Sequence, residues 1–177
     1  MKKLILIAHP RPDESVVHKQ WMTEAAKQPE NYTLHNICTA YPDGNIDILS
    51  EQQLIENHDE LIIQFPCFWF STPPLLKQWQ DDVIRRGWAF GGGTAMRGKR
   101  VRLAVSAGMR EQSYSVQGRM ACTLAGLLLP FECVCKFIDA HYDGFHAFYG
   151  TQDDADDPEY QDKIALNTRQ YMEFLRN

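Results

Sequence analysis

The sequence lacks the cysteine spacing that marks many metal-binding and redox domains. It contains no Cys-x-x-Cys pair, and its five cysteines, an odd number, are Cys38, Cys67, Cys122, Cys133 and Cys135. A four-cysteine zinc site is therefore not expected, and no other metal site is predicted. We expect the cysteines to be small buried side chains in a reducing cytosol.

A basic surplus and long apolar runs are also missing. The 177 residues carry 18 basic and 23 acidic side chains, a net charge of −5, so nucleic-acid binding is not expected. The first apolar run, Leu4–Ala8, is too short for a signal peptide, and no later run approaches the length of a membrane span. We therefore expect a cytoplasmic protein, and its length suits one domain over residues 1–177.

Short apolar runs alternate with segments of helical composition along the whole chain. The expected strands are residues 4–8, 32–37, 60–65, 101–106 and 131–138. The expected helices are residues 15–28, 48–58, a helix opening at 72–74, 115–129 and 158–175. This alternation predicts an α/β domain with a parallel sheet and helices on both faces. Five strands favour the flavodoxin-like order 2-1-3-4-5.

In such a sheet, ligands bind beyond the carboxyl ends of the strands, where the strand order reverses. The loops concerned are residues 9–15, 66–72 and 107–114. The first leads into a helix whose opening residues, Ser15, Val16 and Val17, offer free backbone N–H groups to an anion. His9 and His18 can add donors or positive charge. A phosphate site and a plain helix cap explain this loop equally well.

The second loop carries the most informative run, Phe65-Pro66-Cys67-Phe68-Trp69-Phe70. Aromatic side chains cluster where a core strand should give way to polar residues. The alternative is that these aromatic rings complete the hydrophobic core. Successive extended residues point in opposite directions, so we expect some of the four rings to do so but not all of them. A flat ligand such as an isoalloxazine ring needs aromatic packing together with backbone N–H and C=O groups, and this loop offers both.

The third loop begins with the small residues Ser106, Ala107 and Gly108, which let a ligand approach the backbone closely. Tyr114 can donate a proton or a hydrogen bond there, and an ordinary strand-to-helix turn is the alternative. Farther on, residues 141–149 are expected to form a second pocket wall or a subunit contact. The acidic run 153–157 is expected to be solvated surface.

Taken together, these loops resemble the flavodoxin-2 family of NAD(P)H:quinone oxidoreductases. That family includes mammalian quinone reductases, bacterial general stress proteins and ancillary flavoproteins of glutathione-gated potassium efflux systems. The resemblance covers roughly the first two thirds of the chain and rests on Ala8-His9-Pro10 with Ser15, the run from Phe65 to Trp79, residues 86–91, and Ser106–Gly108 with Tyr114.

The resemblance implies a flavin, FMN or FAD, and hydride transfer from NADPH or NADH through that flavin to a quinone or similar electrophile in ping-pong fashion. It implies phosphate contacts at His9, Ser15 and His18, ring contacts at Pro66, Cys67, Phe68, Trp69 and Phe70, and an opposite rim at Ser106, Ala107 and Gly108. It also implies a homodimer. FMN is favoured over FAD because the chain is shorter than the mammalian forms.

Two departures from the family concern the chemistry. Mammalian members carry a histidine six residues beyond the tyrosine, and Met120 stands there, so Tyr114 is expected to act alone or with solvent. Phe68 stands where a polar glutamine is common. A second function implied by the resemblance is that of an ancillary regulatory subunit of a potassium efflux antiporter, bound at the membrane periphery.

Overall fold

A sheet of five parallel strands forms the centre of the computed structural model, which describes residues 2–177. Its order is β2-β1-β3-β4-β5, which confirms the predicted flavodoxin-like fold class. The strands are β1 (Lys3–Ile7), β2 (Tyr32–Asn36), β3 (Glu60–Pro66), β4 (Arg100–Ala107) and β5 (His141–Tyr149).

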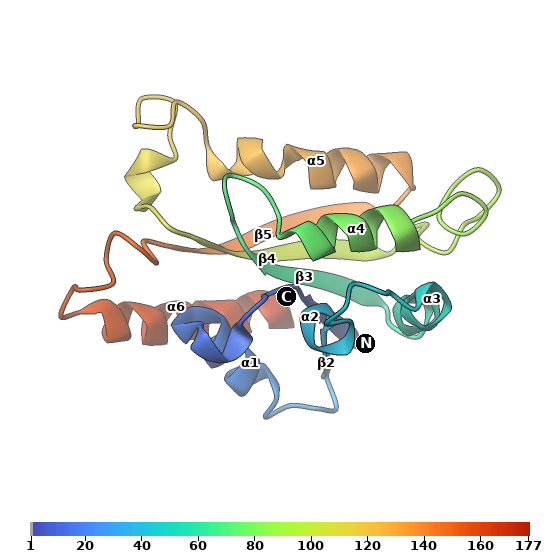
Figure 1. Cartoon of the computed structure of the whole chain (residues 1–177), viewed down its shortest axis with the longest axis horizontal. Helices are drawn as coiled ribbons and strands as arrows, with labels where there is room; N and C mark the ends of the chain where they lie inside the picture. The colour runs from blue at the N-terminus through green and yellow to red at the C-terminus, as the bar shows by residue number, and fades with distance from the viewer. Residues whose placement is uncertain (1) are drawn as a thin grey trace.

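Helices cover both faces of this sheet (Figure 1). One face carries α1 (Val16–Ala25) and α6 (Tyr160–Arg176). The other carries α3 (Ile48–Glu56), α4 (Pro74–Val83) and α5 (Leu124–Phe137), with the short α2 (Ile37–Ala40) beside them. Two 3₁₀ turns, η1 (Pro12–Glu14) and η2 (Glu111–Ser113), follow β1 and β4. No helix among residues 2–177 is long and apolar enough to cross a bilayer.

The central strands are apolar on both sides because helices cover both sides. In β1, Leu4 and Leu6 pack in the cluster under α3, α4 and α5, whereas Ile5 and Ile7 pack in the cluster under α1 and α6. All five β1 residues are buried, as in other doubly covered parallel sheets. The continuous apolar run at the start of the chain is thus explained by helices that cover both faces of the sheet.

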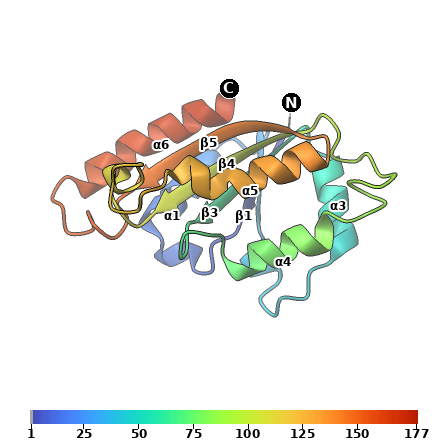
Figure 2. The same cartoon turned by 90° about the horizontal axis from the view of Figure 1, so that it is seen from above.

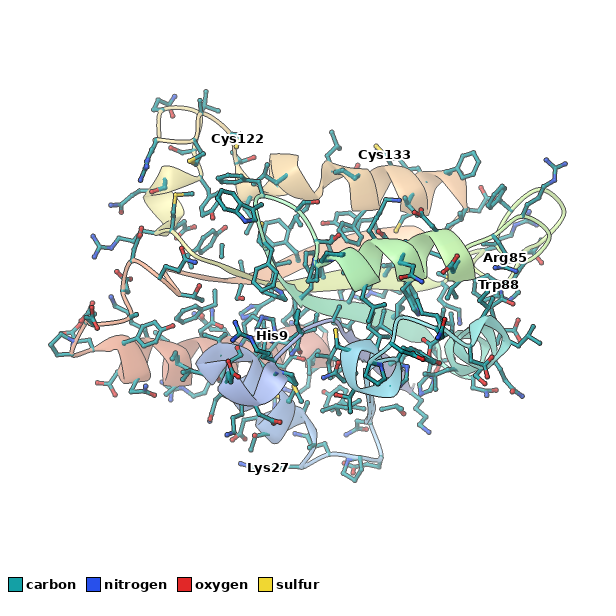
Figure 3. The ribbon with its side chains drawn as sticks, viewed as in Figure 1. His9, Lys27, Arg85, Trp88, Cys122 and Cys133 are labelled. Atoms are coloured by element: carbon teal, nitrogen blue, oxygen red, sulfur yellow. The ribbon has the colours of Figure 1, made fainter. Side chains whose placement is uncertain are left out.

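The fifth strand was predicted wrongly. Residues 131–137 lie in helix α5 and Ile138 is its C-cap, whereas β5 is the segment 141–149 that was expected to be a pocket wall or a subunit contact. Leu124, Leu128, Phe131 and Cys135 are the buried face of α5, at helical spacing. Cys133, expected to be buried beside Cys135, is exposed on the opposite side of the helix (Figure 3).

The boundary error has a second part. The predicted helix 115–129 is correct only for its last residues, because residues 115–123 form turns and Thr123 caps α5 by accepting a hydrogen bond from Gly126 N at 3.0 Å. Pro130 lies inside the helix on its exposed side, where its missing N–H and its ring are tolerated. The expected helix ended at residue 129, directly before this proline.

Candidate functional site

The three loops named from the sequence meet at the carboxyl edge of the sheet, on the left of the centre in Figure 1. Ala8 N donates to Gln64 O at 2.8 Å, and Cys67 N donates to Ser106 O at 2.7 Å, so the strand ends are joined directly. The rings of His9 and Phe68 lie edge to face, with centroids 6.4 Å apart. One surface therefore receives residues from β1, β3 and β4.

The first loop delivers the amino end of α1 to this surface. Ser15 is the cap, and its Oγ accepts from His18 N at 3.1 Å. Within the described part of the chain, the N–H groups of Val16 and Val17 have no protein acceptor. These two free donors add to the partial positive charge of the helix end. The same helix end can therefore be capped by Ser15 and still bind an anion.

His9 lies beside this helix end (Figure 3). Its Nδ1 accepts from Arg11 N at 3.1 Å, which leaves Nε2 as the ring donor of the neutral form. Burial and the nearby Arg11 guanidinium lower the pKa of His9 below its usual range. The ring is therefore a neutral donor at neutral pH. Arg11 itself is exposed and paired with Glu14 at 2.9 Å.

The second loop is a tight turn with an unusual sequence. Phe68 and Ser71 exchange two backbone hydrogen bonds of 3.0 Å, so Trp69 and Phe70 are the two central residues. Both have positive φ, 47° and 63°. This geometry normally selects Asn-Gly or Gly, because a side chain strains the left-handed conformation. Two strained aromatic residues at a strand end indicate a functional constraint.

Aromatic side chains of the run divide between core and surface, as predicted. Phe65 is buried and stacks on Phe131 at 5.3 Å, whereas Phe68, Trp69 and Phe70 are exposed to 43%, 93% and 38%. Pro66 is the buried last residue of β3. Trp69 and its neighbours Phe68 and Phe70 form a contiguous exposed apolar patch, which marks a surface made for contact.

A pocket of about 250 Å³ opens beneath the turn, between α4 and α5. Its lining is mainly apolar, and it includes Phe65, Cys67, Phe70, Leu128, Pro130 and Val134. Burial raises the pKa of the Cys67 thiol, so this cysteine stays protonated and serves as an apolar wall.

The third loop leaves little room at its small residues. A Cβ atom at Gly108 would lie 2.9 Å from the Gln152 side-chain oxygen, so only glycine fits there without a shift. Gln152 N and Asp153 N both donate to Gly108 O, at 2.9 and 3.2 Å. The segment after β5 is therefore built onto the rim of the site.

Sequence reasoning missed this rim segment because it misplaced β5. Asp154, expected to be solvated with its acidic neighbours, is 8% exposed. It binds Arg110 Nε at 2.5 Å and Lys163 Nζ at 3.3 Å, so it ties the β4 loop to α6. The pairing of this acidic segment with the basic residues at 110 and 163 could not be inferred from the sequence, because those residues are distant in the chain.

Tyr114 follows η2 and is 8% exposed, with its ring 5.8 Å from that of Tyr149. Burial, with the Cys67 thiol nearby as a smaller cause, raises the pKa of Tyr114. The phenol therefore remains protonated at neutral pH and is available there as a hydrogen-bond donor. Its catalytic use stays a prediction.

His18 differs from the other predicted contact residues because its ring is fully buried. Its Nε2 lies 2.8 Å from Ser106 Oγ, and its Nδ1 lies 3.2 Å from Gln64 Nε2. Both ring nitrogens thus have protein partners, and the ring has no free atom for a phosphate. Gln64 and its partner Tyr171 were not singled out from the sequence, since a polar residue inside a strand is usually read as a tolerated exception.

Comparison with known proteins agrees with this geometry. The profile of the flavodoxin-2 family, described as a flavodoxin-like fold, matches residues 1–172. A Bacillus subtilis (strain 168) protein named "Uncharacterized NAD(P)H oxidoreductase YrkL" is 41% identical over 152 residues, 85% of this chain and 87% of that protein. The potassium-efflux ancillary protein KefG of Pectobacterium carotovorum (strain PC1) is 39% identical over 142 residues, 80% and 77% of the two chains.

Two solved structures extend the comparison. General stress protein 14 of Treponema denticola, in complex with FMN, superimposes with a TM-score of 0.93 and 38% identity over 99% of this chain and 98% of its own. An NADPH-quinone reductase from P. pentosaceus superimposes with a TM-score of 0.83 and 27% identity over 97% of each chain.

Proposed function

This chain belongs to the flavodoxin-2 family, and we propose that it is an FMN-dependent oxidoreductase that uses NAD(P)H to reduce quinones or similar electrophiles by two electrons. The oxidoreductase class and the nicotinamide donor are supported by relatives such as YrkL. FMN is supported by the Treponema denticola complex, and the quinone by the P. pentosaceus enzyme. Each of these relatives covers most of both chains.

The amino end of α1 fits the phosphate of FMN. The free N–H groups of Val16 and Val17 and the neutral His9 donor all present hydrogen to an anion. Ser15 Oγ accepts from His18 N and keeps its own proton available. No basic side chain is needed, because helix-end donors and dipole together form an anion site.

The turn and the β4 loop fit the isoalloxazine ring. Turn geometry leaves the backbone N–H of Trp69 outside the Phe68–Ser71 hydrogen-bond pair, where a ring heteroatom can meet it, whereas the Phe70 N–H faces the Cys67 sulfur. On the other side, the β4 loop, with Gln152 packed against Gly108, forms the opposite rim. The strained conformation of Trp69 and Phe70 is the observation that carries this assignment, since nothing in the core requires it.

FMN, when bound, would supply the hydride-accepting and two-electron chemistry that links a reduced nicotinamide to the acceptor. The chain's own residues hold the two partners in turn over one face, between the exposed aromatic turn and the β4 loop. Tyr114 remains protonated because it is buried, and it supplies the donor nearest to an acceptor oxygen in this proposal. A shared site for donor and acceptor implies ping-pong kinetics.

The test is reconstitution of the purified protein with FMN, followed by stopped-flow reduction with NADH and with NADPH. We expect a one-to-one complex whose flavin absorbance bleaches with at least one nicotinamide and returns when a quinone is added. Steady-state rates should give parallel double-reciprocal lines. A protein that binds no FMN, or whose bound FMN neither nicotinamide reduces, contradicts the proposal.

We infer further that the protein is a homodimer. Phe70 of the turn and Pro130 of α5 line the same pocket. We define the α5–turn patch as the exposed apolar residues of these two segments: Trp69, Leu129, Pro130, Cys133 and Phe137. Leu129 and Phe137 are 51% and 69% exposed. Figure 2 looks down on α4 and α5, the side that carries this patch. A second copy is the occupant that removes this apolar surface from water and completes the pocket under the turn.

Regulation of a potassium efflux antiporter is the second candidate function, supported by the 39% identity to KefG. This function is compatible with flavin binding. An experiment that distinguishes the two candidate functions must therefore test binding to the antiporter and not binding to the cofactor. Co-reconstitution with a glutathione-gated antiporter in vesicles tests it. Potassium efflux that rises on addition of this protein supports the regulatory function, and unchanged efflux argues against it.

A further inference from the structure

A buried chain of hydrogen bonds runs from α6 through the centre of the sheet to the site. Tyr171 OH lies 2.9 Å from Gln64 Oε1, Gln64 Nε2 lies 3.2 Å from His18 Nδ1, and His18 Nε2 lies 2.8 Å from Ser106 Oγ. Tyr171, Gln64 and His18 are fully buried, whereas Ser106 is 6% exposed. The chain therefore has one closed end and one end that reaches the surface.

The chemistry of the four groups gives this chain a direction. An amide NH₂ can only donate, so His18 Nδ1 accepts from Gln64 and the ring proton of neutral His18 is on Nε2. His18 therefore donates to Ser106 Oγ, and the hydroxyl proton of Ser106 is free to point outward. Tyr171 starts the series by donating to the Gln64 carbonyl oxygen.

The opposite direction is disfavoured at the closed end. If Ser106 donated to His18, then His18 would donate to the Gln64 oxygen and the Gln64 amide would donate to Tyr171. The Tyr171 hydroxyl proton would then have no acceptor, because among residues 2–177 Gln64 is its one hydrogen-bond partner. A buried donor without an acceptor is costly, whereas Ser106 can direct its proton to a ligand or to water.

The ring of His18 is held in its neutral form by its surroundings. Burial, and to a smaller extent the neighbouring His9, lower the pKa of His18 well below its usual range. The His9 ring lies 4.9 Å away and the Trp21 ring 5.1 Å away, so apolar and aromatic surfaces enclose it. A neutral histidine is required for the direction described above, because the protonated ring cannot accept at Nδ1.

We propose that Tyr171, Gln64 and His18 act as positioning residues that fix the Ser106 hydroxyl as a hydrogen-bond donor to the polar half of the flavin. This inference rests on the proposed function for the identity of the ligand, but the direction of the chain is a property of the protein alone. The acceptor is a carbonyl oxygen or a ring nitrogen on the polar side of the isoalloxazine, since the dimethylbenzene ring carries no acceptor atom.

The first measurement is the tautomer of His18, read from ring-nitrogen shifts in NMR of the full-length protein with and without FMN. We expect the Nε2–H tautomer in both states. Glu replaces Gln64 at the same size but can accept from both neighbours, so Gln64→Glu should move the proton to Nδ1 and turn the Ser106 hydroxyl inward. A wild-type protein with the Nδ1–H tautomer overturns the proposal.

The second measurement is the dissociation constant of FMN from flavin fluorescence, together with the midpoint potential of the bound flavin. Ser106→Ala should weaken FMN binding about tenfold, the effect of one lost hydrogen bond, and lower the potential because a donor to the pyrimidine half is lost. Ser106→Thr keeps the hydroxyl and should restore both values. The result for Gln64→Glu depends on its His18 tautomer. If the ring proton of His18 is on Nδ1, the FMN affinity and the flavin potential should fall to the values of Ser106→Ala.

A matched control separates this effect from general loss of stability. Thr168 is buried on the same helix as Tyr171, and its Oγ1 donates to Ile164 O at 2.8 Å, outside the chain of four. Thr168→Val should reduce stability without changing FMN affinity, flavin potential or the His18 tautomer. If Ser106→Ala binds FMN as the wild type does, the donor role is wrong. If the wild type binds no FMN, the proposed function fails while the tautomer still decides the direction of the chain.

Discussion

At the scale of single residues, the backbone of Trp69 and Phe70 is the most telling feature of the molecule. A left-handed conformation costs a non-glycine residue roughly 1–2 kcal/mol, and two such residues stand side by side here with φ of 47° and 63°. The tryptophan side chain is 93% exposed, so packing within the chain does not repay this cost. A contact made outside the monomer, with the flavin or with a second subunit, is the physical reason to keep it.

Trp69→Gly tests this interpretation because glycine adopts positive φ freely. Glycine also loses more entropy on folding, about 0.5–1 kcal/mol, so the expected net gain in the free energy of unfolding is roughly 0.5–1 kcal/mol for the flavin-free protein. FMN affinity should fall in the same variant. Urea denaturation and a flavin titration measure the two quantities.

Phe68→Gly is the control, since Phe68 lies in the same turn but is not among the residues with positive φ. That variant should lower stability, because glycine there gains nothing and loses side-chain contacts. Equal destabilisation by the two glycine variants would show that the conformation of Trp69 carries no strain.

At the scale of elements, the predicted and observed structures agree where the apolar residues follow one pattern. They disagree where the apolar residues fit both strand and helix spacing. The continuous apolar runs of β1, β3 and β4 have a single interpretation, and all three were predicted within one or two residues. Residues 131–138 contain alternating apolar residues after Pro130, which suggested a strand, but Phe131 and Cys135 continue the helical face of α5. The true β5 contains one fully buried residue, Phe148, so its own pattern was weak.

The layer between the sheet, α1 and α6 contains the buried His18 and the half-buried His146, which make stability depend on pH. Burial is the main cause that lowers the pKa values of His18 and His146 below the ordinary value of about 6.5. In the unfolded chain these histidines take up a proton as the pH falls through that value, while in the folded protein they do so only at lower pH. The unfolded state therefore binds more protons, and the free energy of unfolding should fall as the pH drops from 7 to 5.

The slope reaches at most about 1.4 kcal/mol per pH unit for each such histidine. Urea denaturation at pH 7, 6 and 5 measures it. His146→Gln should flatten the dependence, because one proton-binding site of the unfolded state is removed. His141→Gln, at a side chain that is 70% exposed, should leave the slope as it is. A slope that is the same in all three proteins would contradict this account.

At the scale of the whole molecule, the topology of the sheet determined how much of the site could be predicted. Once the order 2-1-3-4-5 was inferred, the three loops at the carboxyl edge followed from it, and residues from all three do meet there. What could not be predicted depends on contacts between distant segments. The burial of His18 under Gln64 and Tyr171, and the attachment of the segment after β5 to Gly108, require the packed structure.

The same limit applies to the surface between subunits, because an apolar stripe on α5 is visible only after the buried face of that helix is known. Leu129→Glu places a charge at the centre of the α5–turn patch and should convert the proposed dimer into a monomer. Light scattering coupled to size-exclusion chromatography measures the mass directly.

Leu49→Glu is the matched control: Leu49 is 78% exposed on α3, away from the patch, and its variant should remain dimeric. Since the pocket under the turn adjoins the patch, the Leu129→Glu monomer should also bind the quinone more weakly. A wild-type protein that is monomeric at micromolar concentration would leave the exposed Trp69 to be explained by the flavin alone.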